Sequence, residues 1–494
     1  MRTIHANFCL MNSETEAEKV LKKYFSHPSF RGNQEIIINR LLSGSGNHCL
    51  VLMPTGAGKS LCYQVPSLCL PGGTLVISPL ISLMKDQVDS LKSRGIKAAF
   101  INSTVSREKK EKRLEQFVSG KIKILYITPE RFKKPDFMRS IRQADISLLA
   151  VDEAHCISVW GSDFRPDYSR IGEFREALGN PLTIALTASA TPEVQKDIVR
   201  CLGLEQDEVK IFHQGIKRPN LRLEAEEMLD EDAKIAKILT LIEENPGSGI
   251  IYFALIRTLE NFSELLDRKK ISHLTYHGKL PQRERRDVQN IFMKEQELVL
   301  ATNAFGMGID KADIRLIVHA EIPGSIESYY QEIGRAGRDG KPALCFLLYN
   351  QDDLTIHMDF IKWSNPEPSY YEKLHQFLQK NMDKVNAFGR DYLNDQLVYK
   401  NRFDFRLETA LGLMERYGVL SGSIPQKNLT IMGELPPELT DQERHDEGIM
   451  HDRKKLLGIV NYFRSESCRF AGIEEYFGFP GEEDCGHCDN CLDL

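Results

Sequence analysis

Long runs of apolar residues are missing from this chain of 494 residues. No stretch approaches the roughly 20 residues that a membrane helix needs, and residues 1–12 lack the basic and then apolar pattern of a secretory signal. Charged residues make up 27% of the chain and hydrophobic residues 41%, which is ordinary for a globular protein. We therefore expect a cytoplasmic protein of about two to four domains, without a membrane partner.

An excess of positive charge is also absent, because 70 acidic residues outnumber 64 basic ones and leave a formal net charge of −6. A protein with this balance does not coat nucleic acid by overall attraction, so any polynucleotide contact has to use local patches. Of the eleven cysteines, seven are scattered, as in proteins of a reducing compartment. The other four lie within the last 27 residues and need a separate explanation.

Residues 53–60 (MPTGAGKS) are typical of a loop that binds phosphate. They lie between an apolar run that predicts a strand and a segment with a helical pattern, where free N–H groups and the helix dipole favour an anion. Lys59 supplies charge for the β- and γ-phosphates, and Ser60 supplies an oxygen for Mg²⁺. The general pattern has glycine where this chain has Met53, and the alternative is a chance Gly-Lys-Ser sequence in an ordinary loop. The candidate nucleotide-binding residues here are Thr55, Gly56, Gly58, Lys59 and Ser60.

An aromatic and basic stretch precedes this loop at residues 21–34. Gln34 can form two hydrogen bonds with the edge of an adenine, and Arg31 or His27 can stack on its face. The stretch therefore predicts a base-binding lid. The alternative is a helix, a turn and a second helix that begins near Asn33.

Short β-branched and leucine-rich runs alternate with helix-like segments in both halves of the chain. Because buried parallel strands are apolar on both faces, this pattern predicts two α/β domains with parallel sheets, joined near residues 215–220. Two such domains form a cleft, and ligands favour clefts between domains. The expected strands cover residues 74–78, 122–127, 147–151 and 183–186, then 249–253, 298–301, 316–319 and 344–349.

The expected strand at residues 147–151 is followed directly by Asp152 and Glu153. A carboxylate at the end of a buried strand, in the sheet that carries a phosphate loop, can hold Mg²⁺, and its neighbour can orient the attacking water. We assign these roles to Asp152 and Glu153, with Ser60 as the second magnesium ligand. The alternative is a pair of acidic residues at a strand end with no reaction to perform.

Two stretches of the second half are candidates for the opposite wall of the cleft. Residues 301–310 (ATNAFGMGID) are glycine-rich, and we select Gly308 and Asp310 for nucleotide contact. Residues 329–340 place Arg335 and Arg338 three apart, on one face of an expected helix. Nucleotide hydrolysis needs cationic charge at the γ-phosphate, which an arginine of the second domain would supply when the cleft closes. The alternative is a surface helix end with exposed arginines.

Beyond residue 350 the alternating pattern stops, and residues 364–463 are mostly polar and helical in pattern. Within them, an apolar helical stripe at residues 407–414 precedes two short strand candidates at 417–420 and 429–431. A helix followed by a hairpin is typical of a winged helix that binds duplex DNA. A helical connector is the alternative.

Four cysteines close the chain with the spacing C-x16-C-x2-C-x2-C. Four thiolates of this kind predict a closed tetrahedral Zn²⁺ site, which has no open position for a substrate and is therefore structural. An iron–sulfur cluster or two disulfides are the alternatives. The expected ligands are Cys468, Cys485, Cys488 and Cys491.

These motifs resemble those of superfamily 2 helicases with a DEAH box. Several stretches are closer still to the RecQ family of ATP-dependent DNA helicases: residues 78–87 (SPLISLMKDQ), 128–131 (TPER), 156–166 (CISVWGSDFRP) and 187–191 (TASAT). The resemblance covers residues 21–340 and resumes over 462–491.

The resemblance implies an α/β fold with two RecA-like parallel-sheet domains, a mostly helical region and a small zinc-binding subdomain. The expected ranges are 1–12 for an N-terminal extension, 13–215 for the ATP-binding domain, 216–352 for the second domain, 353–460 for the helical region with the candidate winged helix, and 461–494 for the zinc subdomain.

The resemblance also implies that residues 187–191 couple the nucleotide site to the nucleic-acid groove, and it favours Arg338 as the arginine finger with Arg335 as its partner. Three residues depart from the family pattern. Ser26 stands where the family usually has glycine, and Val159 and Ser162 stand where it usually has glutamine and histidine. The last two departures bear on how tightly ATP turnover is coupled to DNA.

The loop that follows Glu153 contains Trp160, Phe164 and Arg165. Two aromatic side chains and an arginine suit stacking on bases and contact with phosphate. Because the loop leaves the strand that carries the water-orienting carboxylate, we expect it to sense DNA. The alternative is a buried Trp160, since tryptophan is usually largely buried.

The leading hypothesis is a 3′–5′ DNA helicase that couples ATP hydrolysis to translocation on single-stranded DNA and to duplex unwinding in recombination or repair. Its expected cofactors are ATP, Mg²⁺ and Zn²⁺. Its expected partners are single-stranded and tailed duplex DNA and repair proteins such as a single-strand-binding protein, at the nucleoid if the source is bacterial.

Two other functions compete with this hypothesis. The first is an RNA helicase of the same superfamily, against which the zinc cysteines and the tryptophan loop argue. The second is a nucleic-acid-binding scaffold with weak ATPase activity. The presence of Lys59, Asp152 and Glu153 together with Arg338 argues against it.

Overall fold

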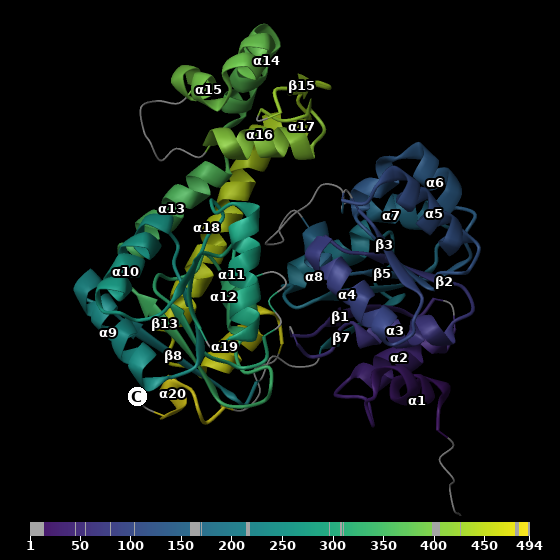
Figure 1. Ribbon diagram of the computed structural model, residues 1–494, viewed down its shortest axis with the longest axis horizontal. Helices are drawn as coiled ribbons and strands as arrows, with labels where there is room; N and C mark the ends of the chain where they lie inside the picture. Colours follow the sequence, from purple (N-terminus) through teal and green to yellow (C-terminus); the bar gives the residue numbers. More distant parts are fainter. Residues whose placement is uncertain are drawn as a thin grey trace, which may run out of the picture.

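The computed structural model contains two lobes, each built on a parallel sheet, and a helical extension that points away from them (Figure 1). The structure describes residues 14–44, 46–54, 56–79, 81–102, 104–158, 168, 170–213, 218–295, 297–306, 309, 311–397, 406–424, 426–479 and 484–492. Among the helices of these residues, none is long and apolar enough to cross a membrane.

The first lobe (residues 14–213) contains a seven-stranded parallel sheet in the order β3-β4-β2-β5-β6-β1-β7. Its strands are β1 (His48–Leu52), β2 (Gly73–Ile77), β3 (Ala98–Ile101), β4 (Ile124–Ile127), β5 (Ile146–Val151), β6 (Leu182–Thr187) and β7 (Val209–His213). Its α-helices are α1 (Glu16–Val20), α2 (Gln34–Leu42), α3 (Leu61–Cys69), α4 (Ile81–Ser93), α5 (Arg107–Val118), α6 (Pro135–Ile141), α7 (Ile171–Ala177) and α8 (Pro192–Cys201).

Strand β1 shows why the first sheet is covered on both faces. All five of its residues are buried, and successive side chains point to opposite faces of a sheet. Cys49 and Val51 therefore join one apolar cluster, whereas Leu50 and Leu52 join the other. The helices supply the remaining apolar side chains of both clusters.

The second lobe (residues 218–349) contains a six-stranded parallel sheet in the order β10-β11-β9-β12-β13-β8. Its strands are β8 (Leu221–Glu227), β9 (Ser248–Tyr252), β10 (Leu274–Tyr276), β11 (Leu298–Ala301), β12 (Ile314–His319) and β13 (Ala343–Tyr349). Its α-helices are α9 (Glu231–Glu244), α10 (Ile256–Arg268), α11 (Gln282–Lys294) and α12 (Ile326–Ile333).

Every strand expected from the sequence is present, and the prediction of two parallel sheets is confirmed. The four strands that the sequence did not indicate are β3, β7, β8 and β10, and each lies at an edge of its sheet. An edge strand is less completely covered, so it tolerates polar side chains and can lose the continuous apolar run, as in β7 (VKIFH) and β8 (LRLEAEE). Strand β3 (AAFI) is apolar and is not explained in this way.

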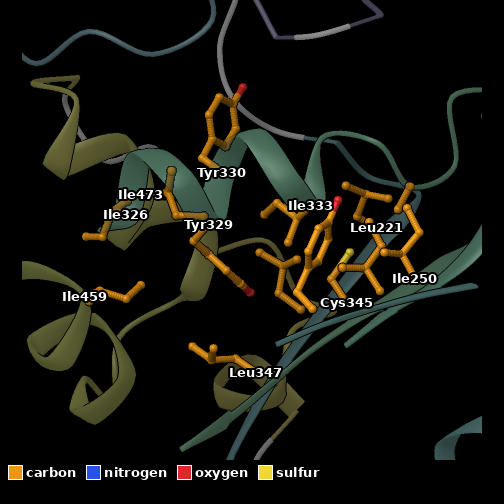
Figure 2. Close-up of a cluster of buried hydrophobic side chains, with 14 of the residues drawn as sticks. Leu221, Ile250, Ile326, Tyr329, Tyr330, Ile333, Cys345, Leu347, Ile459 and Ile473 are labelled. Carbon is orange, nitrogen blue, oxygen red and sulfur yellow. The ribbon is translucent and has the colours of Figure 1, made fainter. Parts of the chain in front are cut away.

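The C-terminal segment completes the core of the second lobe. Helices α18 (Gln442–Arg464), α19 (Arg469–Tyr476) and α20 (Asp489–Leu492) follow the helical extension. Figure 2 shows Ile459 of α18 and Ile473 of α19 in one buried cluster with Ile326 and Tyr329 of α12. The C-terminal segment that carries the four cysteines therefore shares its apolar core with the second sheet.

The helical extension lies between α13 (Asp353–Ser364) and α18 and has an apolar cluster of its own. It consists of α14 (Pro368–Phe388), α15 (Arg390–Leu397), α16 (Arg406–Arg416), β14 (Leu420–Ser421), β15 (Thr430–Ile431) and α17 (Pro437–Thr440). Strands β14 and β15 pair antiparallel directly after α16, so the expected helix followed by a hairpin is confirmed.

Candidate functional site

The phosphate loop joins β1 to α3, and its two described glycines have positive φ angles of 81° at Gly56 and 83° at Gly58. The positive φ of Gly58 favours glycine there, and a Cβ atom would lie 2.6 Å from Gln34 Nε2 and would displace the end of that side chain. Lys59 Nζ is buried, makes no hydrogen bond with the described part of the chain, and lies 3.9 Å from Glu153 Oε1. Because a buried ammonium without hydrogen bonds is costly, this geometry fits a phosphate oxygen at Lys59.

Asp152 and Glu153 directly follow β5 and lie at the same end of the sheet as the phosphate loop. Glu153 has a φ of 47°, which is unusual for a residue other than glycine and indicates local strain. Burial and the neighbouring Glu153 carboxylate raise the pKa of Asp152, and Lys59 opposes this rise. Because the two carboxylates repel each other, a bound cation would be favoured here. With Ser60 at the start of α3, the donor oxygens fit Mg²⁺.

A chain of polar contacts leads from Glu153 into the second lobe. His155 Nδ1 lies 3.4 Å from Glu153 Oε2 and 3.0 Å from Thr187 Oγ1. Thr187 Oγ1 accepts a hydrogen bond from Ser189 N at 3.2 Å, and Ser189 Oγ accepts one from Gln331 Nε2 of α12 at 2.8 Å. The family resemblance implied a coupling role for residues 187–191 but gave no signal for Gln331, because its partner Ser189 lies in the other lobe.

The two arginines follow α12. Their predicted place on one face of a helix is wrong, because α12 ends at Ile333 and the next residues form turns. Arg335 N and Ala336 N donate to the carbonyls three residues back, Glu332 O and Ile333 O, so the α-helical pattern is already lost before Gly337, whose φ is 53°. The turns let the two guanidinium groups take different directions.

Arg338 lies against the phosphate loop, whereas Arg335 is held within its own lobe. The Cγ and Cδ atoms of Arg338 lie 3.4 Å from the position that a Cβ of Gly56 would take, and its Nη1 donates to Ile309 O at 3.0 Å. Arg335 is buried and donates to Gly306 O. The positions agree with the preference for Arg338 as the arginine finger, which stays a prediction.

The expected adenine lid packs against the phosphate loop from the other side. Gln34 is buried, accepts from Arg31 N at 2.9 Å, and donates to Ala57 O and Gly58 O at 3.2 Å each. Both polar ends of its amide are thus bonded to main chain, and a contact with adenine would compete with these bonds. His27 is half-buried and Arg31 is exposed.

Ser26, one of the three departures from the family pattern, has a φ of 57°. This left-handed conformation explains why glycine is usual at the position, since glycine adopts it without a steric penalty. Other expected site residues lie outside the described residues: Thr55, Trp160, Phe164, Arg165, Gly308 and Asp310, as do the departures Val159 and Ser162.

Four cysteine sulfur atoms meet near the end of the chain, as the spacing predicts. The Sγ atoms of Cys468, Cys485, Cys488 and Cys491 all lie within 4.8 Å of one another. The distance of 3.8 Å between Cys485 Sγ and Cys491 Sγ suits the edge of a tetrahedron with Zn–S bonds of about 2.3 Å. The main-chain N–H of Arg469 points at Cys488 Sγ (3.5 Å) and that of Cys485 at Cys468 Sγ (3.3 Å). This donor set fits a closed structural zinc site.

A cavity of about 270 Å³ in the second lobe had no signal in the sequence. Its lining includes Tyr252 at the end of β9, Glu321 just after β12, and Asp452 of α18. Burial raises the pKa of Glu321 to about 7. The lining residues come from segments that are far apart in the chain, so no local motif marks them.

Comparison with protein families supports this arrangement along most of the chain. Residues 31–198 match the DEAD/DEAH box helicase family, residues 233–340 the helicase conserved C-terminal domain, and residues 432–492 the RecQ zinc-binding family. These ranges contain the phosphate loop, the arginines and the four cysteines respectively.

Two curated relatives come from Bacillus subtilis. The ATP-dependent DNA helicase RecQ is 36% identical over 97% of this chain and 67% of its own length. The probable ATP-dependent DNA helicase RecS is 39% identical over 77% of this chain and 76% of its own length. Among solved structures, Dbp5 of S. cerevisiae bound to RNA and ADP-BeF3 is 16% identical with a TM-score of 0.53, over 68% of this chain and 89% of that chain. This last likeness concerns the fold alone.

Proposed function

This chain belongs to the RecQ family of ATP-dependent DNA helicases, and we propose that it hydrolyses ATP to move 3′–5′ along single-stranded DNA and to separate duplex strands. The observation that carries the proposal is the meeting of two sets of residues where the lobes contact each other. Lys59, Asp152 and Glu153 lie on one wall, and Arg338 reaches the phosphate loop from the other.

Each of these residues has a separate part in the proposed hydrolysis. Lys59, whose ammonium has no hydrogen bond among the described residues, would contact the β- and γ-phosphates. Ser60 and Asp152 would hold Mg²⁺, which supplies positive charge to the phosphate oxygens when bound. Glu153 would orient the attacking water, and Arg338 would neutralise charge that develops in the transition state.

The contacts from Glu153 through Ser189 to Gln331 support coupling between hydrolysis and movement of the lobes. A change in the nucleotide at Glu153 would alter a hydrogen bond that joins the two walls of the cleft. Domain closure that completes a catalytic site is a common way of tying a reaction to motion. We infer that opening and closing of the cleft drives stepping along the strand.

DNA is the proposed nucleic acid, since the relatives at 36–39% identity are named DNA helicases. The RNA-bound solved structure shares only the fold. Trp160, Phe164 and Arg165 would stack on bases and hold phosphate. The helix and hairpin formed by α16, β14 and β15 support a second contact with duplex DNA. Recombination and repair, a single-strand-binding protein as partner, and a cytoplasmic or nucleoid location are further parts of this proposal.

Strand displacement tests the proposal directly. With ATP, we expect the protein to unwind a duplex that carries a 3′ tail and to leave the matched duplex with a 5′ tail intact. Equal displacement of both substrates would contradict the direction. Stimulation of ATPase activity by single-stranded RNA as strong as that by DNA would contradict the choice of substrate.

A further inference from the structure

Three residues at the end of α19, Phe477, Gly478 and Phe479, lie between the two lobes. We call them the aromatic strap. The ring of Phe479 packs against core clusters of both lobes. Both phenylalanines also line a small gap together with Met53 and Pro54, which begin the phosphate loop. The strap therefore contacts the start of the phosphate loop, although its residues belong to the C-terminal segment that carries the four cysteines.

On the side of the second lobe, the strap supports the helix that leads to the arginines. Phe477 is fully buried, and its ring lies 5.4 Å from that of Tyr330 in α12. Figure 2 shows that Tyr330 points away from the other labelled side chains of the cluster. The next residue, Gln331, donates the hydrogen bond to Ser189. Hence the contact of Phe477 with Tyr330 and the hydrogen bond of Gln331 to Ser189, which joins the lobes, both involve the same turn of α12.

On the side of the first lobe, all three residues of the strap make a contact. Gln195 Nε2 of α8 donates to Phe477 O at 3.5 Å, and the ring of Phe479 meets that of His213 edge to face at 4.2 Å. Gly478 has a φ of 79°, and a Cβ atom there would lie 2.3 Å from Pro192 Cγ. The glycine is required both by its conformation and by this close approach.

The strap is rigidly connected to the second lobe. It forms the C-terminal cap of α19, where Gly478 N donates to Glu475 O and Phe479 N donates to Glu474 O, both at 2.9 Å. At the other end of α19, Arg469 forms a two-pronged ion pair with Asp489 at 2.8 and 2.9 Å. Asp489 in turn accepts from Ala225 N of β8 at 2.9 Å. A short helix thus connects the sheet of one lobe to the surface of the other.

We propose that the strap positions α12 against the phosphate loop, so that Phe477 and Phe479 are positioning residues for ATP hydrolysis. This inference rests on the proposed ATPase function. If the strap is weakened, α12 is free to move away from the loop, and Arg338 meets the phosphates in a smaller fraction of the molecules. Nucleotide binding, which depends mainly on Lys59 and the loop, is preserved.

The test is Phe479→Ala, because this ring is only partly buried and its removal leaves Phe477 in the core. An aromatic contact contributes about 0.5–1.5 kcal/mol, which corresponds to a fall of about two- to tenfold in kcat. We expect KM for ATP, affinity for a fluorescent ATP analogue and zinc content to stay as in the wild type. The matched control is Phe388→Ala, which removes a 69% exposed ring of the helical extension and should leave kcat unchanged.

A double-mutant cycle with His213→Ala distinguishes positioning from general loosening. If the two rings act through their contact, the double variant should lose little more kcat than Phe479→Ala alone. Fluorescent labels on the two lobes should also show a broader distance distribution in Phe479→Ala, and Phe479→Leu should restore part of the lost kcat.

The outcomes separate this inference from the proposed function. A wild-type protein without ATPase activity would contradict the proposed function itself. An active wild type with an equally active Phe479→Ala variant would overturn the inference alone. A variant that loses nucleotide affinity or zinc along with kcat would overturn it too, because the strap would then be part of the folding core.

Discussion

The two lobes share a parallel sheet covered by helices, but they complete their cores in different ways. Both apolar clusters of the first lobe are built from residues between Ala17 and Phe212, with Phe479 only at the margin. The main cluster of the second lobe includes buried residues of α18, α19 and the cysteine segment. The first lobe therefore completes its core with its own stretch of chain, whereas the second lobe completes its core with residues that follow the helical extension.

The residues that we propose for ATP hydrolysis are also divided between the two lobes. The first lobe holds Lys59, Asp152 and Glu153, which we propose face the nucleotide, and the second contributes Gln331 and Arg338, which contact the first lobe. Damage to the first lobe should therefore abolish the reaction itself. Damage to the second lobe or to its C-terminal support should alter the rate and the coupling while nucleotide binding persists.

Loss of zinc should give the largest difference between the lobes. We expect Cys488→Ser to unfold the C-terminal segment and expose the sheet of the second lobe, because structural zinc contributes on the order of 10 kcal/mol to folding. Hydrogen exchange should show faster exchange in β8 to β13 and unchanged protection in β1 to β6. Cys201→Ser, at a half-buried thiol outside the cluster, is the control. Equal loss of protection in both lobes would show that their cores are not independent.

Removal of the loop ammonium should abolish the chemistry without affecting the fold. In Lys59→Ala, we expect ATPase activity to fall at least about a hundredfold, because a charge directed at the phosphates is lost. The melting temperature should not fall, since Lys59 Nζ is buried without a hydrogen bond in the described structure. Lys112→Ala, on the exposed face of α5, should behave like the wild type. Near-normal turnover in Lys59→Ala would contradict the assignment of the loop.

The fold was predictable where a strand is buried on both faces and less so elsewhere. The central strands β1, β2, β5 and β6 have continuous apolar runs that the sequence displays. Edge strands such as β8 carry charged residues on their more exposed face and lack this signal. The helix expected around Arg335 and Arg338 was wrong because the chain leaves the α-helical pattern after Ile333, and Gly337 then adopts a positive φ. A glycine shows that such a conformation is allowed, but tertiary contacts decide whether it is used.

The candidate site was predictable where its residues form a local motif. The phosphate loop, the carboxylates after β5 and the four cysteines all have fixed spacings. The contacts between lobes have no such spacing: Gln331 meets Ser189, and Phe479 meets His213, only after both lobes have folded. The cavity beside Glu321 combines residues of the second sheet with residues of α13 and α18 for the same reason.

The buried carboxyl of Glu321 should make the second lobe sensitive to alkaline pH, as the buried carboxyl of Asp152 should make the first. Burial raises its pKa from 4.5 to about 7, so the folded protein holds the proton more tightly than the unfolded chain does. The stability contributed by neutral Glu321 is complete below about pH 4.5 and is lost as pH rises through about 7. Glu321→Gln stays neutral and keeps an oxygen for Ala254 N. Its stability should exceed that of the wild type by at most about 3 kcal/mol at alkaline pH.

Thermal melting at about pH 5 and pH 8 checks this expectation. The advantage of Glu321→Gln over the wild type should be small at the lower pH and larger at the higher one. Glu372→Gln, at an exposed position of α14, should show no such trend. An advantage that is the same at both pH values would mean that ionisation of Glu321 does not limit the stability of the lobe.

The smallest expected effect concerns the single hydrogen bond between Gln331 and Ser189. A bond of this kind contributes about 1 kcal/mol, so Gln331→Ala should lower kcat for ATP by about fivefold. ATP affinity should not change, because we propose that the first lobe binds the nucleotide. Ser189→Ala should give a similar loss, and the double variant little more than either one, since each removes the same bond. Gln351→Ala, at an exposed glutamine between β13 and α13, is the control. If Gln331→Ala raised KM and left kcat unchanged, the second lobe would take part in binding, and the division of labour between the lobes would not hold.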